Sequence, residues 1–165
     1  MRSVSGDAAI PGSTGPPRLQ PFGLILHHDG HFTHEGAPIR NRLLREHFDR
    51  SVEYLPDEGE YIVRLKHFRG QVEVQEAGFF VRSIELESGE IALSDGSREV
   101  LDVATLSVSP IDGALLCRIK RDRVLGGLPA RFRHSVQAEF LQAIEPEGDR
   151  YVVSIGGGRV VCPEF

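Results

Sequence analysis

The sequence is short of the residues from which several protein classes are built. Among its 165 residues are two cysteines and no tryptophan. The cysteines, Cys117 and Cys162, belong to no CxxC pair, which excludes a disulfide scaffold, a zinc ribbon and a dithiol redox motif. Cys117 alternates with the apolar residues Leu115 and Ile119, a pattern typical of a buried thiol. We therefore expect a reduced intracellular chain with unreactive cysteines.

Long hydrophobic runs are also missing. No apolar stretch approaches the roughly 20 residues of a membrane helix, and the N-terminus lacks the apolar core of a secretory signal. The net charge of -5 disfavours nucleic-acid binding, because duplex recognition depends on clustered Lys and Arg. These absences predict a cytoplasmic protein with neither membrane nor nucleic acid as a partner.

Recognisable catalytic and cofactor motifs are absent as well. The sequence has no GxSxG elbow, P-loop, EF-hand loop, or GxGxxG after a strand. His34 and Glu35 are followed by Gly36 and Pro38, which break the helix that a HExxH zinc motif requires. Residues 156–158 are three glycines in a late hairpin, where they indicate a turn. We expect no cofactor.

Histidines are concentrated in one short segment, but their geometry disfavours a metal site. Four lie within eight residues, namely His27, His28, His31 and His34. A two-residue turn at Asp29-Gly30 would place His28 and His31 on one face and the other two on the opposite face. A longer turn changes the pairing but still divides the set. Because three ligands do not converge, no metal is expected.

Hydrophobic periodicity predicts many short strands and two helices. Helices are expected at about 41–48 and about 130–144, where apolar residues recur at helical spacing. Strands are expected at 24–28, 31–34, 61–66, 71–75, 79–87, 90–93, 98–101, 106–108, 114–120, 151–155 and 159–162. The order favours an α+β protein, mostly antiparallel β with two short helices, rather than a parallel βαβ fold. No internal repeat of fixed period is evident.

The division of the chain follows from composition and turn signals. Residues 1–21 are rich in Gly, Ser and Pro and predict a disordered tail. An N-terminal subdomain at 22–88 and a C-terminal subdomain at 89–165 are expected, with the boundary near the turn signal Ser88-Gly89.

In these features the sequence resembles the bacterial family catalogued as domain of unknown function 1285 (DUF1285). The resemblance is carried by Asp29-Gly30-His31-Phe32, by the segments 34–39 and 71–79, and by Gly126-Gly127-Leu128. It covers nearly all of residues 24–163. It implies two small packed subdomains, one a β-barrel and the other an α/β roll, with no established activity.

The strongest functional signal is a basic cluster around a glycine pair. Gly126 and Gly127 precede Pro129, which is expected to start a helix whose first turn carries Arg131 and Arg133. Helix N-termini and arginines bind anions, and glycine lets a ligand approach the backbone. The candidate site comprises Arg118, Lys120, Arg121, Gly126, Gly127, Arg131 and Arg133.

Charge is unevenly distributed along the chain, which leaves two interpretations of that cluster. Residues 53–113 hold thirteen acidic and five basic side chains, whereas residues 114–134 hold six basic and one acidic. The two segments can attract one another within the fold or be solvated faces. Alternatively, the basic segment binds an external anion.

Three hypotheses of function follow. The first is a non-enzymatic binding module for an anionic small molecule or an acidic protein surface. The second is an enzyme of unrecognised type that uses His31, His34, Glu35 or His134 in a cleft between the subdomains. The third is a structural protein that forms homo-oligomers through exposed strand edges.

Overall fold

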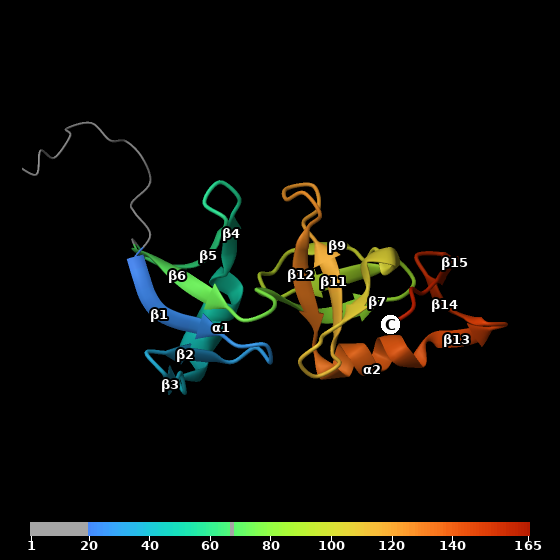
Figure 1. Ribbon diagram of the computed structural model, residues 1–165, viewed down its shortest axis with the longest axis horizontal. Coiled ribbons are helices and arrows are strands. Elements are labelled where there is room, and N and C mark those ends of the chain that lie inside the picture. The colour runs from blue at the N-terminus through green and yellow to red at the C-terminus, as the bar shows by residue number, and fades with distance from the viewer. Residues whose placement is uncertain (1–19, 67) are drawn as a thin grey trace, which may run out of the picture.

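Two six-stranded sheets form the centres of two lobes that lie side by side along the long axis of the molecule (Figure 1). The protein is represented by a computed structural model that describes residues 20–66 and 68–165. The predicted tail at 1–21 falls largely on residues 1–19, outside the described residues, and the first strand begins at Gln20.

The first lobe contains six strands and one helix. Its strands are β1 (Gln20–Leu26), β2 (Phe32–His34), β3 (Ala37–Pro38), β4 (Glu53–Leu55), β5 (Glu60–Leu65) and β6 (Phe68–Val74), in the order β3-β2-β1-β6-β5-β4. Helix α1 (Arg42–Ser51) lies between β3 and β4 in the chain. Asn41 caps it by accepting a hydrogen bond from the Leu44 N–H at 3.1 Å, so the predicted helix at 41–48 is confirmed and extends to Ser51.

The second lobe is built around another six-stranded sheet. Its strands are β7 (Phe79–Glu85), β8 (Glu90–Leu93), β9 (Arg98–Val100), β10 (Ser107–Val108), β11 (Leu115–Ile119) and β12 (Leu128–Phe132), in the order β10-β11-β12-β7-β8-β9. A 3₁₀ turn, η1 (Val103–Thr105), separates β9 from β10.

The two sheets share one topology. Each consists of two three-stranded antiparallel meanders, and the first strand of the earlier meander pairs in parallel with the last strand of the later one. These parallel pairs are β1 with β6 and β7 with β12. The repeat was not evident in the sequence, because the meanders match in strand order and not in residue spacing.

Two sequence-based expectations about the sheets are wrong. The β-barrel implied by the family resemblance is not formed, since both sheets are open and end on short edge strands. Barrel closure would require those edge strands to pair with each other. The sheets are also mixed rather than wholly antiparallel, because each contains a central parallel pair. The α+β class with two short helices is confirmed.

The second helix is shorter than predicted. Residues 130–132 belong to β12, and helix α2 runs only from His134 to Gln142. Phe132, Val136 and Phe140 do share a buried cluster, so their four-residue spacing is real, but Phe132 reaches that cluster from a strand. After α2 a three-stranded sheet follows, made of β13 (Ile144–Glu147), β14 (Arg150–Ile155) and β15 (Gly158–Val161).

The change from one sheet to the other occurs between Val74 and Phe79, earlier than the boundary expected at Ser88-Gly89. Gly78 lies at this junction, where a Cβ atom would meet the Tyr61 ring, 2.7 Å from its Cδ1 atom. Only glycine fits there without displacing the ring. Buried side chains of both lobes form one continuous hydrophobic cluster, which fixes the two sheets against each other.

Among residues 20–66 and 68–165, neither helix has the length and apolar content of a membrane-crossing segment.

Candidate functional site

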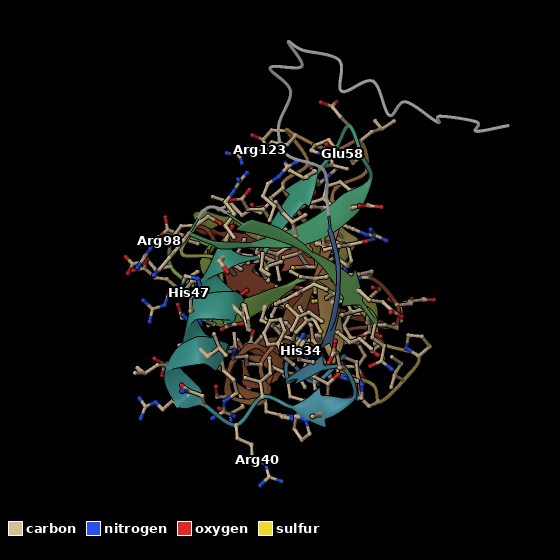
Figure 2. The ribbon with its side chains drawn as sticks, turned by 90° about the vertical axis from the view of Figure 1, so that its left-hand side faces the viewer. His34, Arg40, His47, Glu58, Arg98 and Arg123 are labelled. Atoms are coloured by element: carbon tan, nitrogen blue, oxygen red, sulfur yellow. The ribbon has the colours of Figure 1, made fainter. Side chains whose placement is uncertain are left out.

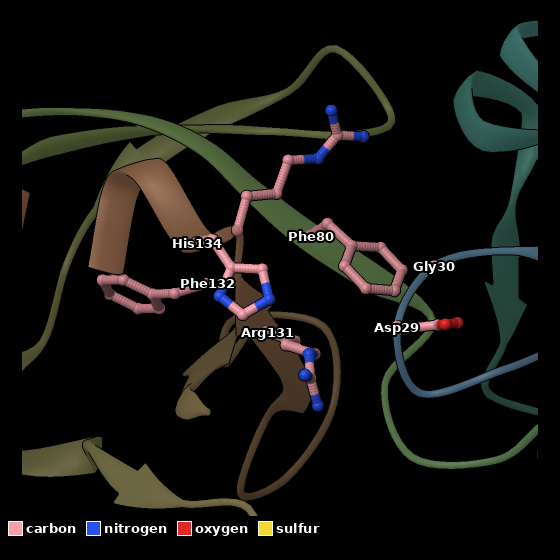
Figure 3. A pocket seen from close by; sticks show the side chains of 7 residues that line it. Asp29, Gly30, Phe80, Arg131, Phe132 and His134 are labelled. Atoms are coloured by element: carbon pink, nitrogen blue, oxygen red, sulfur yellow. The ribbon is translucent and has the colours of Figure 1, made fainter. Parts of the chain in front are cut away.

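A pocket of about 320 Å³ lies where the first lobe meets the junction of β12 and α2 (Figure 3). Its lining combines cationic, aromatic and loop residues, namely Asp29, Gly30, Phe80, Arg131, Phe132, Arg133 and His134. In Figure 3 the rings of Phe80 and His134 border the same space as Arg131, and the Asp29 carboxylate points away from it.

Strand pairing places the two arginines at the pocket. Strand β12 lies between β11 and β7, with Arg131 opposite Leu116 on one side and Phe80 on the other. The Arg133 N–H then donates to the Val81 carbonyl at 3.2 Å. Arg133 is the N-cap of α2, and its side chain makes no capping hydrogen bond. The first N–H groups of the helix therefore have no side-chain acceptor, which leaves a partial positive charge beside the pocket.

Arg131 is held by carboxylates of its own chain. Its side chain is only 5% exposed, and its Nη1 atom donates to Glu76 at 3.2 Å and to Asp112 at 3.0 Å. The hydrogen bond from Arg131 lowers the pKa of the Asp112 carboxyl to about 2. Ser109 donates a further hydrogen bond of 2.6 Å to Glu76. Arg131 thus lines the pocket although its guanidinium is already neutralised by these carboxylates.

Arg133 has a less complete set of partners. It donates to Asp49 of α1 at 3.0 Å, and the same carboxylate oxygen accepts a hydrogen bond of 3.2 Å from Arg82. Burial raises the pKa of Asp49, although both arginines oppose that rise. Two guanidinium groups share one carboxylate, and the Arg133 side chain remains 44% exposed. Arg133 is therefore available to a second anion.

The rest of the predicted basic cluster lies elsewhere, around the end of β11 and the following turn. Lys120 donates to Asp95 at 2.9 Å, and Arg121 pairs with Asp102. A separate hollow of about 380 Å³ includes Arg118, Lys120 and Arg121. The structure thus divides the predicted site residues between two places instead of gathering them in one.

The uneven charge distribution has an internal explanation. Lys120, Arg121 and Arg131 pair with carboxylates that all belong to the acidic segment 53–113. The interpretation that the two segments attract one another within the fold is confirmed for these pairs.

The glycine pair opens a strand, not a helix, so the predicted helix start at Pro129 is wrong. Gly126 and Gly127 have positive φ angles of 78° and 71°. A Cβ atom on Gly127 would lie 2.7 Å from the Ile119 carbonyl oxygen. Gly127 is therefore required by the tight turn between β11 and β12.

The four histidines that are close in sequence make different local contacts. The rings of His27 and His31 stack with centroids 4.3 Å apart, so the pairing of His28 with His31 that a two-residue turn would give is not formed. The reason is the longer turn, in which the His27 N–H donates to the His31 carbonyl at 2.9 Å. In the described part of the chain, no group of three His, Cys, Asp or Glu residues could hold a metal ion.

Of the residues considered for catalysis, only His134 lines the pocket. His31 pairs with Asp29, and the His34 ring lies 4.8 Å from the Phe22 ring. Glu35 occupies a turn with a φ of 50°. These contacts do not bring His31, His34 and Glu35 together with His134.

Sequence reasoning missed the residues that complete the site. Phe80 is buried in β7, and Asp49 and Arg82 come from elements far from Arg133 in the sequence. The only sequence signal for Asp49 is an acidic residue close to the end of an arginine-rich helix, which does not specify a distant partner.

Comparison with known proteins supports the fold. No protein-family model matches the sequence, and no curated protein matches it. Among solved structures, a DUF1285 family protein from Silicibacter pomeroyi DSS-3 matches with a TM-score of 0.59 and 16% identity, over 90% of this chain and 87% of that chain. A DUF1285 family protein from Shewanella baltica OS155 gives a TM-score of 0.48 and 15% identity, over 73% of this chain and 91% of that chain. The resemblance noted in the sequence is confirmed by the first of these matches: the chain shares the fold of a bacterial DUF1285 family protein.

Proposed function

We propose that the protein is a non-enzymatic binding module for a small anionic ligand, which occupies the pocket at the junction of β12 and α2. The observation that carries the proposal is the half-exposed Arg133, which shares the Asp49 carboxylate with Arg82 and borders a pocket of about 320 Å³. That volume is within the range of small-molecule sites.

The arrangement suits a single carboxylate or phosphate group. Arg133 can donate two parallel hydrogen bonds to such a group, and the ring of His134 is on the same wall. The ring of Phe80 supplies an apolar wall. An acidic side chain of another protein offers the same carboxylate chemistry, so an acidic protein surface is the alternative ligand. Arg131 acts as a support, because its charge is neutralised internally.

Isothermal titration calorimetry with inorganic phosphate and with acetate tests this proposal. Arg133→Gln and His134→Asn should each weaken binding at least tenfold. Arg118→Gln is the matched control: it removes one exposed charge that belongs to the predicted cluster but lies outside this pocket. Unchanged affinity in Arg133→Gln, or an equal loss in Arg118→Gln, would contradict the assignment of the pocket.

A second candidate function, homo-oligomer formation, is favoured by an apolar surface formed by the end of α2, strand β14 and the C-terminal residues. Large apolar side chains there are exposed, with Leu141 at 44%, Tyr151 at 62% and Phe165 at 54%. They border a hollow of about 580 Å³. Sedimentation equilibrium should detect a dimer that Tyr151→Glu dissociates; a monomer at the highest attainable concentration would contradict this function.

A further inference from the structure

The two lobes also face each other across a second cavity. None of its lining residues belongs to the pocket at α2. It has a volume of about 220 Å³ and lies between the hairpin β4–β5 of the first lobe and the hairpin β11–β12 of the second. In Figure 1 the turns of these hairpins project from the same side of the molecule, and Figure 2 shows Glu58 and Arg123 at that same end.

The lining of this cavity is largely apolar. Five residues form that part of its wall, namely Val52, Pro56, Phe79, Val124 and Leu128. Pockets for drug-sized ligands start at about 300 Å³, so a cavity of about 220 Å³ accommodates a body no larger than one ring or a short alkyl chain.

Four charged residues line the cavity, the carboxylates Glu53 and Asp95 and the cations Lys120 and Arg123, and Glu53 pairs with Arg64, which does not belong to the lining. Glu53 accepts a hydrogen bond of 2.9 Å from Arg64, and Asp95 one of 2.9 Å from Lys120. Both carboxylates are thereby neutralised. Arg123 also lines the cavity, and within residues 20–66 and 68–165 no carboxylate lies within ion-pair distance of it.

Lys120 holds this arrangement in place. Its backbone has a φ of 53°, which is unfavourable for a residue with a side chain. Several contacts hold Lys120 in this strained conformation. Its N–H donates to Glu99 at 3.1 Å, and its Nζ atom donates to Asp95 and lies 5.0 Å above the Phe79 ring. Because the Arg123 and Val124 N–H groups both donate to the Lys120 carbonyl, the turn that carries Arg123 is fixed by the same residue. Such strain is characteristic of binding sites.

A polar group on the opposite wall completes the site. The Tyr54 ring packs against Tyr61 at 5.0 Å between centroids, and its hydroxyl has no hydrogen-bond partner among the described side chains and backbone groups. A phenol hydroxyl donates readily to a carboxylate.

We propose that this cavity binds a small organic monocarboxylate, with the carboxylate at Arg123 and the Tyr54 hydroxyl and the apolar body against Phe79 and Leu128. Highly charged anions are disfavoured, because Asp57 and Glu58 form the turn beside Pro56 at the rim and repel a second negative charge. The site is separate from the phosphate or carboxylate pocket proposed at α2, with which it shares no lining residue.

Amide chemical shifts in ¹H–¹⁵N spectra test the proposal with three probes: benzoate, its neutral analogue benzamide, and inorganic phosphate. Benzoate should shift the amides of residues 54, 55, 57–59 and 120–127, benzamide should bind at least tenfold more weakly, and phosphate should leave these amides unchanged. Phosphate shifts at Gly30 and residues 133–136 would report the α2 pocket independently.

Variants identify the contacts. Arg123→Gln should weaken benzoate binding at least tenfold, and Tyr54→Phe, which keeps the ring and removes only the hydroxyl, should weaken it severalfold. Arg40→Gln is the matched control, since Arg40 lies at the opposite end of the molecule in Figure 2. Unshifted hairpin amides with benzoate, equal affinity for benzamide, or wild-type affinity in a folded Arg123→Gln protein would each overturn the proposal.

Discussion

The Arg133 guanidinium donates a hydrogen bond of 3.0 Å to the Asp49 carboxylate, and this contact joins two residues that are 84 positions apart. Asp49 belongs to the helix of the first lobe and Arg133 caps the helix of the second. The pair therefore ties the wall of the candidate pocket to the relative position of the lobes.

Asp49 should titrate above the usual range of an aspartate. Burial raises its pKa in the folded protein, so the folded state binds a proton more tightly there than the unfolded state. The contribution of Asp49 to stability should then decrease as the pH rises from the usual aspartate pKa of 3.8 through the higher folded value. A ¹³C titration of the side-chain carboxyl measures this directly, and a midpoint below 3.8 would contradict it.

Asp112 should behave in the opposite way. The hydrogen bond from Arg131 lowers the pKa of its carboxyl to about 2. Its stabilising contribution should be complete above the usual pKa of 3.8 and be lost as the pH falls towards about 2. Urea unfolding between these pH values should show a steeper loss of stability in the wild type than in Asp112→Asn. Equal pH dependence in the two proteins would exclude the effect.

Removing the charge of Arg131 should lower the stability of the folded protein. In Arg131→Met the side chain of Glu76, which is only 10% exposed, is left without its cation, so the free energy of unfolding should fall by about 3 kcal/mol. Arg121→Met is the control, because the Arg121–Asp102 pair is about half exposed and should contribute about 0–1 kcal/mol. Equal losses in the two variants would show that burial does not distinguish these ion pairs.

Gly78→Ala should destabilise the junction of the lobes. The new methyl group would overlap the Tyr61 ring, and overpacking of this kind costs about 1–3 kcal/mol. Gly158→Ala, where no atom lies within 4 Å of the added methyl group, should be tolerated. Thermal unfolding measures both, and a Gly78→Ala protein as stable as the wild type would show that the junction can adjust.

The thiols should be unreactive in the folded protein. Burial raises the pKa of Cys117 to about 12 and also raises that of Cys162, and thiolate is the reactive form. Ellman's reagent at pH 8 should modify both cysteines only on unfolding in urea. Rapid modification of native protein would contradict the burial of the thiols.

Alternating hydrophobicity was sufficient to predict most strands, because each sheet buries one face against the core. It failed at Phe132, whose spacing to Val136 and Phe140 matches a helix although Phe132 lies in β12. Strands as short as β3 and β4 contain too few residues to show a period. The parallel pairs β1–β6 and β7–β12 are long-range contacts that no local pattern encodes.

The candidate site was predicted only in part. Arg131 and Arg133 were identified from the sequence and do line one pocket. Their different roles were not foreseen, since they depend on Glu76, Asp112 and Asp49, whose distance in the sequence conceals their proximity. The sequence reports the total charge of a segment, whereas the availability of each charge depends on the fold.

The central claim, that an anion binds beside Arg133, is tested most directly by mapping phosphate binding onto the amide resonances of the whole protein. The account predicts saturable shifts at residues 133–136, where the helix N–H groups border the pocket, and at Gly30 on the facing loop. These shifts should be absent in Arg133→Gln. Saturable phosphate shifts elsewhere, or no saturable shift at these residues in the wild type, would contradict it.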